Sequence, residues 1–268
     1  MNSIYQSLAE LENKNEIAAL CTITSSEGST PRHVGSKMLV YPDGHFIGTV
    51  GGGELENRVI KAALECIQNE AAQTLSYSMA DPSRGDPGVC GGQVEVFVEP
   101  IIPSPLLVVI GAGHVGKAVV HLAKWMGFRV ALSDDRAEFC NPATTPGADA
   151  YYPVPMDELP KHIKIDKRTV LILTTRGSAI DTAGLSPLLD SPAAYIGVIG
   201  SKRRWATTAK ALQEKGIAKE KIARVHSPMG LELQAETPEE IAVSIMAEVM
   251  MVKDKGTGKP MKELGIKH

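Results

Sequence analysis

Strand-like and helix-like patterns of apolar residues follow one another in two different orders along the chain. In the first hundred residues, three stretches rich in strand-forming residues predict strands; they are 17–25, 73–79 and 92–100. Residues 35–50 place two further arms around Pro42-Asp43-Gly44, which predicts a hairpin. Apolar residues spaced by three or four predict helices at 4–13 and 54–68. We therefore expect an N-terminal α+β module with antiparallel strands over residues 1–100.

After residue 105, short apolar strands alternate with helices. The expected strands are 106–110, 129–133, 168–173 and 194–199, and the expected helices are 114–126, 180–189 and 202–215. This alternation is typical of a parallel sheet covered on both faces. A final helix is predicted where Thr237 can cap, Pro238 takes the first helical position and Glu240 completes a capping box. The expected fold class is α/β: the N-terminal module, a proline-punctuated linker (101–105), a Rossmann-like doubly wound parallel sheet (106–254) and a flexible tail (255–268).

The composition is that of an ordinary globular protein, with 268 residues, 43% apolar residues and a net charge of −3. This charge offers no general attraction to nucleic acid or to an anionic membrane. No apolar run approaches the roughly 20 residues that span a bilayer, and the polar N-terminus lacks the apolar core of a secretory signal. The four cysteines, Cys21, Cys66, Cys90 and Cys140, form no CxxC pair, which fits reduced thiols. We expect a cytoplasmic protein with no nucleic-acid or membrane partner.

A glycine-rich turn opens the second part. Gly111, Gly113 and Gly116 form a GxGxxG pattern between a strand and a helix, which is typical of a turn that holds a diphosphate. Asp134 ends the next strand, where a ribose-binding carboxylate is expected, and His114 would lie over the ligand. The alternatives are that the glycines only permit tight packing, that Asp134 and its neighbour cap a helix or lie in a solvated turn, and that His114 is a surface residue.

A second anion site is predicted after a later strand. Ser201 can cap the next helix, and Lys202, Arg203 and Arg204 lie in its first turn, where they oppose the helix dipole unless an anion binds there. A solvated basic face paired with carboxylates is the alternative. Arg176 also follows a strand, so we expect it to meet the glycine-rich turn, Asp134 and Ser201–Arg203 in one crevice. No catalytic dyad is recognisable, because the histidines at 121 and 226 are isolated.

Two separate sets of motifs resemble one family. "GSTPRHVGSKMLV", "DGHFIGTVGGGELE" and "CGGQVEVFVEP" resemble the N-terminal half of the XdhC/CoxI family, accessory proteins of xanthine dehydrogenase and related molybdenum hydroxylases. "GAGHVGKAVVHLAKWMGFRVALSDDR", "TRGSAID", "AYIGVIGSKRR" and "HSPMGLELQAETPEEIAVSIMAE" resemble its Rossmann-like half. The resemblance implies a chaperone without hydride chemistry of its own, which binds molybdenum cofactor (molybdopterin), keeps it sulfurated and delivers it to the hydroxylase. The implied partners are that hydroxylase and a cysteine desulfurase.

The chain departs from the family pattern mainly at two positions, with a milder change at Gln234, where Gly is usual. It has Glu54 where many relatives carry Cys, and Ser178 where many carry His, which puts any sulfur or metal chemistry there in question. Cys90 matches the family's "CGG" and is a candidate molybdenum contact, although a buried structural thiol is the alternative. Gly51, Gly52 and Gly53, with Glu54, are expected to form a contact surface for the cofactor or for the other domain.

Two other functions stay open at this point: an NAD(P)-binding oxidoreductase, and a nucleotide-binding regulatory or structural protein. The client enzyme and the form of the cofactor, mononucleotide or dinucleotide, also stay open. Apolar surface left by a small antiparallel module is compatible with a homodimer.

Overall fold

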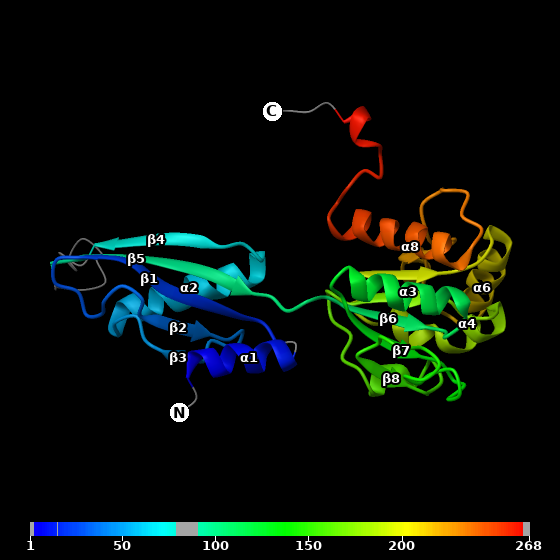
Figure 1. The fold of residues 1–268 in the computed structure, drawn as a ribbon, viewed down its shortest axis with the longest axis horizontal. Helices are drawn as coiled ribbons and strands as arrows, with labels where there is room; N and C mark the ends of the chain where they lie inside the picture. The colour runs from blue at the N-terminus through cyan, green and yellow to red at the C-terminus, as the bar shows by residue number, and fades with distance from the viewer. Residues whose placement is uncertain (1–2, 15, 79–90, 265–268) are drawn as a thin grey trace. The chain divides into compact units, whose positions relative to one another are not determined.

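The structure is a computed structural model of the chain and describes residues 3–14, 16–78 and 91–264. Its contacts divide the chain into two compact units, Met1–Pro103 and Ser104–His268 (Figure 1). Each unit has its own hydrophobic cores and is described separately.

The first unit is a five-stranded antiparallel sheet with a helix against each face. Its elements are α1 (Ile4–Lys14), β1 (Ala18–Glu27), β2 (Lys37–Val40), β3 (Phe46–Gly48), α2 (Gly53–Asn69), β4 (Gln73–Ser78) and β5 (Gln93–Ile101). The strands lie in the order β3-β2-β1-β5-β4. The predicted hairpin is confirmed, since β2 and β3 pair antiparallel with Met38 opposite Gly48.

Successive residues of the central strand β1 contribute to two different cores because their side chains point to opposite faces. Cys21 and Ile23 belong to the core under α2, and Leu20 belongs to the core under α1. The long amphipathic helix α2 contributes Leu55 and Val59 to the larger core. The sheet is thus buried on both faces near the start of β1.

The second unit is a six-stranded parallel sheet. Its elements are β6 (Leu106–Ile110), α3 (His114–Trp125), β7 (Arg129–Ser133), β8 (Ala150–Tyr152), η2 (Leu159–Lys161), β9 (Val170–Leu173), α4 (Ser178–Gly184), α5 (Ser186–Leu189), β10 (Tyr195–Val198), α6 (Lys202–Glu214), α7 (Lys219–Ala223), β11 (Val225–His226), α8 (Pro238–Lys253) and η3 (Met261–Glu263). The strand order is β11-β10-β9-β6-β7-β8. The chain therefore starts in the middle of the sheet, at β6, builds outward to β8, and returns to build the other half from β9. This is the Rossmann strand order, and its direction reverses between β6 and β9.

Helices cover both faces of this sheet (Figure 1). One core lies under α3 and α8 and includes Val119 and Ile245. The other lies under the helices that follow β9 and β10 and includes Leu188 and Leu212. Because the strands are buried on both faces, they are nearly continuous apolar runs, as in Val170–Leu173. The expected fold class, an antiparallel α+β module followed by a doubly wound parallel sheet, is confirmed.

The last helix begins as the sequence predicts. Thr237 Oγ1 accepts a hydrogen bond from Glu240 N at 3.2 Å, and Glu240 Oε2 accepts one from Thr237 N at 3.0 Å. Pro238 is the first residue of α8. The prediction of one helix over 180–189 is wrong: α4 and α5 are separate, with Pro187 in the first turn of α5. Proline lacks the N–H that a continuous helix would need there.

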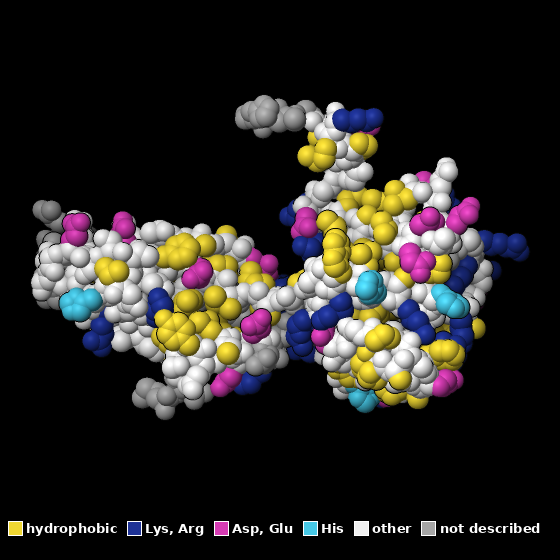
Figure 2. Space-filling view, in the orientation of Figure 1, with side chains coloured by type: hydrophobic (Ala, Val, Ile, Leu, Met, Phe, Trp, Pro, Cys, Tyr) yellow, Lys and Arg dark blue, Asp and Glu magenta, His cyan; other side chains and the backbone are white. Residues whose placement is uncertain are grey.

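Apolar side chains reach the surface of both units (Figure 2). Among the described residues, the most exposed large ones are Tyr5, Trp125 and Met261. A homodimer remains a prediction. No helix in the described ranges is long and apolar enough to cross a membrane.

Candidate functional site

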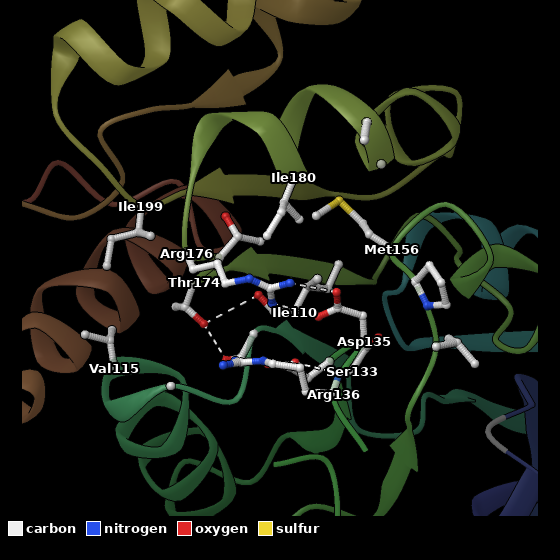
Figure 3. A pocket seen from close by; sticks show the side chains of 18 of the residues that line it. Ile110, Val115, Ser133, Asp135, Arg136, Met156, Thr174, Arg176, Ile180 and Ile199 are labelled. Carbon is white, nitrogen blue, oxygen red and sulfur yellow. Dashed lines mark hydrogen bonds and ion pairs between the residues drawn. The ribbon is translucent and has the colours of Figure 1, made fainter. Parts of the chain in front are cut away.

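A cavity of about 570 Å³ opens at the carboxyl ends of β6, β7 and β9 (Figure 3). This is the place where the strand order reverses, and ligands of doubly wound sheets bind there. The volume lies within the range of about 300–1,000 Å³ that is typical of small-molecule pockets. Apolar side chains, including Val115, Met156 and Ile180, form part of the wall, so the cavity offers both apolar and polar surface.

The glycine-rich turn supplies one side of the cavity. Gly111 and Gly113 line it, whereas Gly116 is buried behind them, where α3 packs closely on the turn. Gly113 is the N-cap of α3 and makes no side-chain cap hydrogen bond, and a Cβ added to it would meet no atom within 4 Å. The space over Gly113 is thus open. His114, the first residue of α3, also lines the cavity and is exposed.

Asp134 lies at the end of β7 and holds the turn in place. Its buried carboxylate accepts hydrogen bonds from Ala112 N at 2.8 Å and from Arg136 N, Nε and Nη2 at 3.0, 2.9 and 2.8 Å. Burial pushes the pKa of Asp134 up, but the hydrogen bonds from Arg136 and Ala112 outweigh it and hold that pKa below its ordinary value. A ribose hydroxyl would have to displace one of these donors. Asp134 is therefore neither a solvated turn residue nor a free acceptor in this arrangement.

The neighbouring Asp135 pairs with Arg176, which follows β9. The two guanidinium nitrogens Nη1 and Nη2 each donate to one carboxylate oxygen at 2.8 Å, and Figure 3 shows the pair reaching across the cavity. The hydrogen bonds from Arg176 lower the pKa of Asp135 to about 2. Both side chains are about half exposed, at 48% for Arg176 and 40% for Asp135.

The predicted second anion site is arranged differently from the expectation. Ser201 caps α6, since its Oγ accepts a hydrogen bond from Arg204 N at 3.2 Å. Lys202 and Arg203 are not among the described residues that line the cavity; Arg204 lines it instead. Its Nε and Nη2 donate to Asp181 Oδ2 at 3.2 and 2.7 Å, so the alternative of a cation paired with a carboxylate applies to this residue.

The sequence held a signal for Arg204. Residues 204, 208 and 212 are spaced by four, and Thr208 and Leu212 are the buried residues of α6. Arg204 therefore lies on the face that packs on the sheet, whereas its neighbour Arg203 does not. Thr175 completes this corner, because it accepts a hydrogen bond from Arg204 Nη2 at 2.7 Å and donates to Asp181.

Ser133, the last residue of β7, is a lining residue that sequence reasoning missed. Its hydroxyl is fully buried and has no hydrogen-bond partner among the described residues. Buried hydroxyls without partners are uncommon in folded proteins. A small polar residue at a strand end carries no distinctive pattern in the sequence, so only the structure reveals it.

The triple glycine lies in the first unit, whereas the cavity belongs to the second. Gly51, Gly52 and Gly53 have positive φ angles of 140°, 82° and 61°, and Gly52 is the N-cap of α2. Glu54 is exposed and accepts a hydrogen bond from Arg58 Nε at 3.2 Å. The expectation that these residues contact the cofactor or the other domain stays a prediction.

The described cysteines are unsuited to bind metal. Cys21, Cys66 and Cys140 are buried, and burial raises the pKa of each thiol, that of Cys21 to about 12. Cys90 lies outside the described residues, so its predicted molybdenum contact remains a prediction. In the described ranges, no group of three or more His, Cys, Asp and Glu side chains could hold a metal ion.

Comparisons with known proteins match both halves of the chain. The model described as "XdhC Rossmann domain" matches residues 107–249, and the model described as "XdhC and CoxI family" matches residues 11–78. A solved structure named as a xanthine dehydrogenase from Bacillus halodurans has a TM-score of 0.51 and 23% identity, and the match covers 95% of this chain and 96% of that one. At this identity the likeness shows a shared fold.

Three curated relatives are similar in sequence. "Uncharacterized protein YqeB" of Escherichia coli K12 is 35% identical over 96% of this chain and 47% of the relative. A protein of Bacillus subtilis 168, named as one subunit of a probable xanthine dehydrogenase, is 29% identical over 60% of this chain and 46% of the relative. "Molybdenum cofactor insertion chaperone PaoD" of Escherichia coli K12 is 24% identical over 88% of this chain and 83% of the relative. The matches to the first two relatives thus span about half the length of those proteins.

Proposed function

Because the chain belongs to the XdhC and CoxI family, we propose that it is an accessory protein that binds molybdenum cofactor and helps to insert it into a xanthine dehydrogenase-type molybdenum hydroxylase. The cofactor is cargo in this role: it supplies the molybdenum centre to the client enzyme. The residues of this chain only hold and orient it.

The cavity at the strand-order reversal carries the proposal. On its polar side, the open space over Gly113 lies in the same cavity as the guanidinium groups of lining arginines such as Arg176. This combination suits the phosphate or diphosphate of a pterin cofactor. Its apolar side, with Met156 and Ile180, suits a flat heterocycle. Ser133 also lines the cavity, and its buried hydroxyl has no partner among the described residues, which favours a polar neighbour at this wall.

The relatives support the same role. PaoD, named a molybdenum cofactor insertion chaperone, aligns over 83% of its own length, and the Bacillus subtilis relative is named as part of a xanthine dehydrogenase. We also propose that the chain protects the sulfurated form of the cofactor and meets a cysteine desulfurase. A thiolate for that chemistry would have to come from Cys90, because the described cysteines are buried with raised pKa values.

A dehydrogenase role has less support. It would need Asp134 to accept hydrogen bonds from a nucleotide ribose, and Ala112 and Arg136 already use that carboxylate. Both aspartates of the motif "SDDR" are paired with arginines, Asp134 with Arg136 and Asp135 with Arg176.

The test is cofactor retention by the full chain. We expect protein from cells that make molybdopterin to carry molybdenum and a pterin that fluoresces after oxidation, and protein from cells that cannot make it to carry neither. Arg204→Gln should retain less pterin than wild type, and Arg203→Gln, one residue away but outside the cavity, is the matched control. If neither preparation retains pterin, and NAD raises the melting temperature, the dehydrogenase role replaces this proposal.

A further inference from the structure

Among the described residues, three arginines that line the cavity pair with aspartates, and the pairs differ in how firmly they are held. In two of them the carboxylate is buried: Asp181, which holds Arg204, is 0% exposed, and Asp134, which holds Arg136, is 2% exposed. The third, Arg176–Asp135, is about half exposed on both sides. Ion pairs in contact with water stabilise a protein weakly, so this third pair is the one that can open at small cost.

The sheet order places this third pair over the glycine-rich turn. Arg176 follows β9 and Asp135 follows β7, and these two strands flank β6 in the sheet. The bidentate bridge therefore spans the carboxyl end of β6, where Gly111 begins the turn. A ligand that lay on the turn would meet the bridge.

Groups that suit an anion lie at the same carboxyl edge of the sheet as the bridge. The first turn of α3 has no side-chain cap, so its N–H groups are available to a ligand. Ser133, whose Oγ is buried and without a partner in the described ranges, lines the same cavity (Figure 3). Both features indicate that a polar group belongs here.

We propose that Arg176 exchanges partners: it holds Asp135 when the cavity is empty and binds the phosphate of the ligand when the cavity is filled. This inference rests on the proposed function only in requiring a phosphate-bearing ligand. Asp135 is then a competing anion that is built into the site.

The competition determines specificity. Arginine presents the same fork of two N–H donors to a carboxylate and to a phosphate. Asp135 carries one negative charge, whereas a terminal phosphate carries between one and a half and two at neutral pH. A ligand with a terminal phosphate can therefore displace Asp135, and a ligand that carries only a carboxylate gains little by doing so.

The two members of the pair should have opposite effects on binding, which a purely structural pair would not show. The test uses the full chain with Arg176→Gln, Asp135→Asn and the control Asp190→Asn. Asp190 belongs to the Lys221–Asp190 pair, whose exposure of 48% and 56% is similar but which does not line the cavity. One arm measures pterin retained per chain, and the other measures the affinities for ADP and AMP by calorimetry. ADP stands for a nucleotide diphosphate and AMP for a single phosphate.

We expect Arg176→Gln to weaken binding about tenfold, because charge-assisted hydrogen bonds are lost. Asp135→Asn should strengthen binding about two- to fivefold, which matches the small stabilisation of an exposed ion pair. Asp190→Asn should bind like wild type. Tighter binding of ADP than of AMP would assign the exchange to a diphosphate, and equal binding to a single phosphate.

The exchange is overturned if Asp135→Asn weakens binding as much as Arg176→Gln, since the pair would then be a fixed part of the wall. It is also overturned if neither variant differs from wild type, or if wild type binds neither ADP, AMP nor pterin. A wild type that retains no pterin but binds ADP with the expected opposite effects would refute the proposed function and support the exchange. If wild type retains pterin and every variant retains the same amount, the result would support the proposed function and refute the exchange.

Discussion

Replacing Gly116 and Gly113 separately by alanine should distinguish packing from ligand binding in the glycine-rich turn. A Cβ at Gly116 would overlap the carbonyl oxygen of Gly111 and lie 2.8 Å from Thr174 Oγ1. That carbonyl cannot move freely, because it accepts a hydrogen bond from Thr174 Oγ1 at 2.7 Å. A Cβ at Gly113 meets no atom within 4 Å. The two changes add the same methyl group, one against packed backbone and the other into open space.

The expected magnitudes differ accordingly. Overpacking lowers the free energy of unfolding by about 1–3 kcal/mol. For Gly116→Ala we expect a loss of about 3 kcal/mol, because the added Cβ overlaps a backbone atom rather than a flexible side chain. For a unit of this size, about 1 kcal/mol lowers the melting temperature by roughly 2–4 °C, so we expect a loss of roughly 6–12 °C. Gly113→Ala should lose less than about 1 kcal/mol, the difference between glycine and alanine at an N-cap.

Tryptophan fluorescence can follow this unfolding specifically, because Trp125 and Trp205 both lie in the second unit. Pterin retention is measured on the same preparations. Gly116→Ala should lose stability, whereas Gly113→Ala should keep its stability and lose pterin, because its methyl group occupies the open space of the cavity. A melting temperature of Gly116→Ala within about 2 °C of wild type would refute the packing argument, because α3 could then move away from the turn freely.

Three further predictions concern carboxylates and a hydroxyl. Asp181→Ala should lower the free energy of unfolding by about 3 kcal/mol in urea, because Arg204 loses its buried counter-charge; a loss below about 1 kcal/mol would contradict this. Ser133→Ala should raise that free energy by up to about 1 kcal/mol, since it removes a buried hydroxyl that has no partner in the described ranges, and a decrease would show that the hydroxyl is bonded. Arg176 lowers the pKa of Asp135 from 3.8 to about 2, so the stabilisation is complete above about pH 4 and is lost as the pH falls through 2. The stability difference between wild type and Asp135→Asn should therefore be constant from about pH 5 to 7 and shrink between about pH 4 and 2; a constant difference down to about pH 2 would contradict the ion pair.

Local signals in the sequence predicted much of the fold. The capping box at Thr237 and the hairpin around Pro42-Asp43-Gly44 are confirmed. Both were predictable because their hydrogen bonds join residues that are close in sequence. The strands Ala150–Tyr152 and Val225–His226 were missed, because two or three residues are too short to show a period. Tertiary pairing alone makes them strands.

The candidate site was less predictable. The sequence identified the ends of β6, β7 and β9 as the place for a ligand, and the structure has a cavity there. It could not show which partner each charged residue takes. Arg176 meets Asp135 across 41 positions of the chain, and Arg204 meets Asp181 across 23. Such pairings depend on the order of the strands in the sheet and on which face of α6 packs against it. Neither can be inferred from single residues of the sequence.

The burial of three thiols makes the chemistry of the fourth measurable. A thiol reacts with alkylating reagents as its thiolate, and burial both shields Cys21, Cys66 and Cys140 and raises their pKa values. Brief treatment of the native protein with iodoacetamide at neutral pH should leave these three unmodified. Any rapid labelling, and any protection from it by a bound cofactor, would then report on Cys90 without a single substitution in the chain.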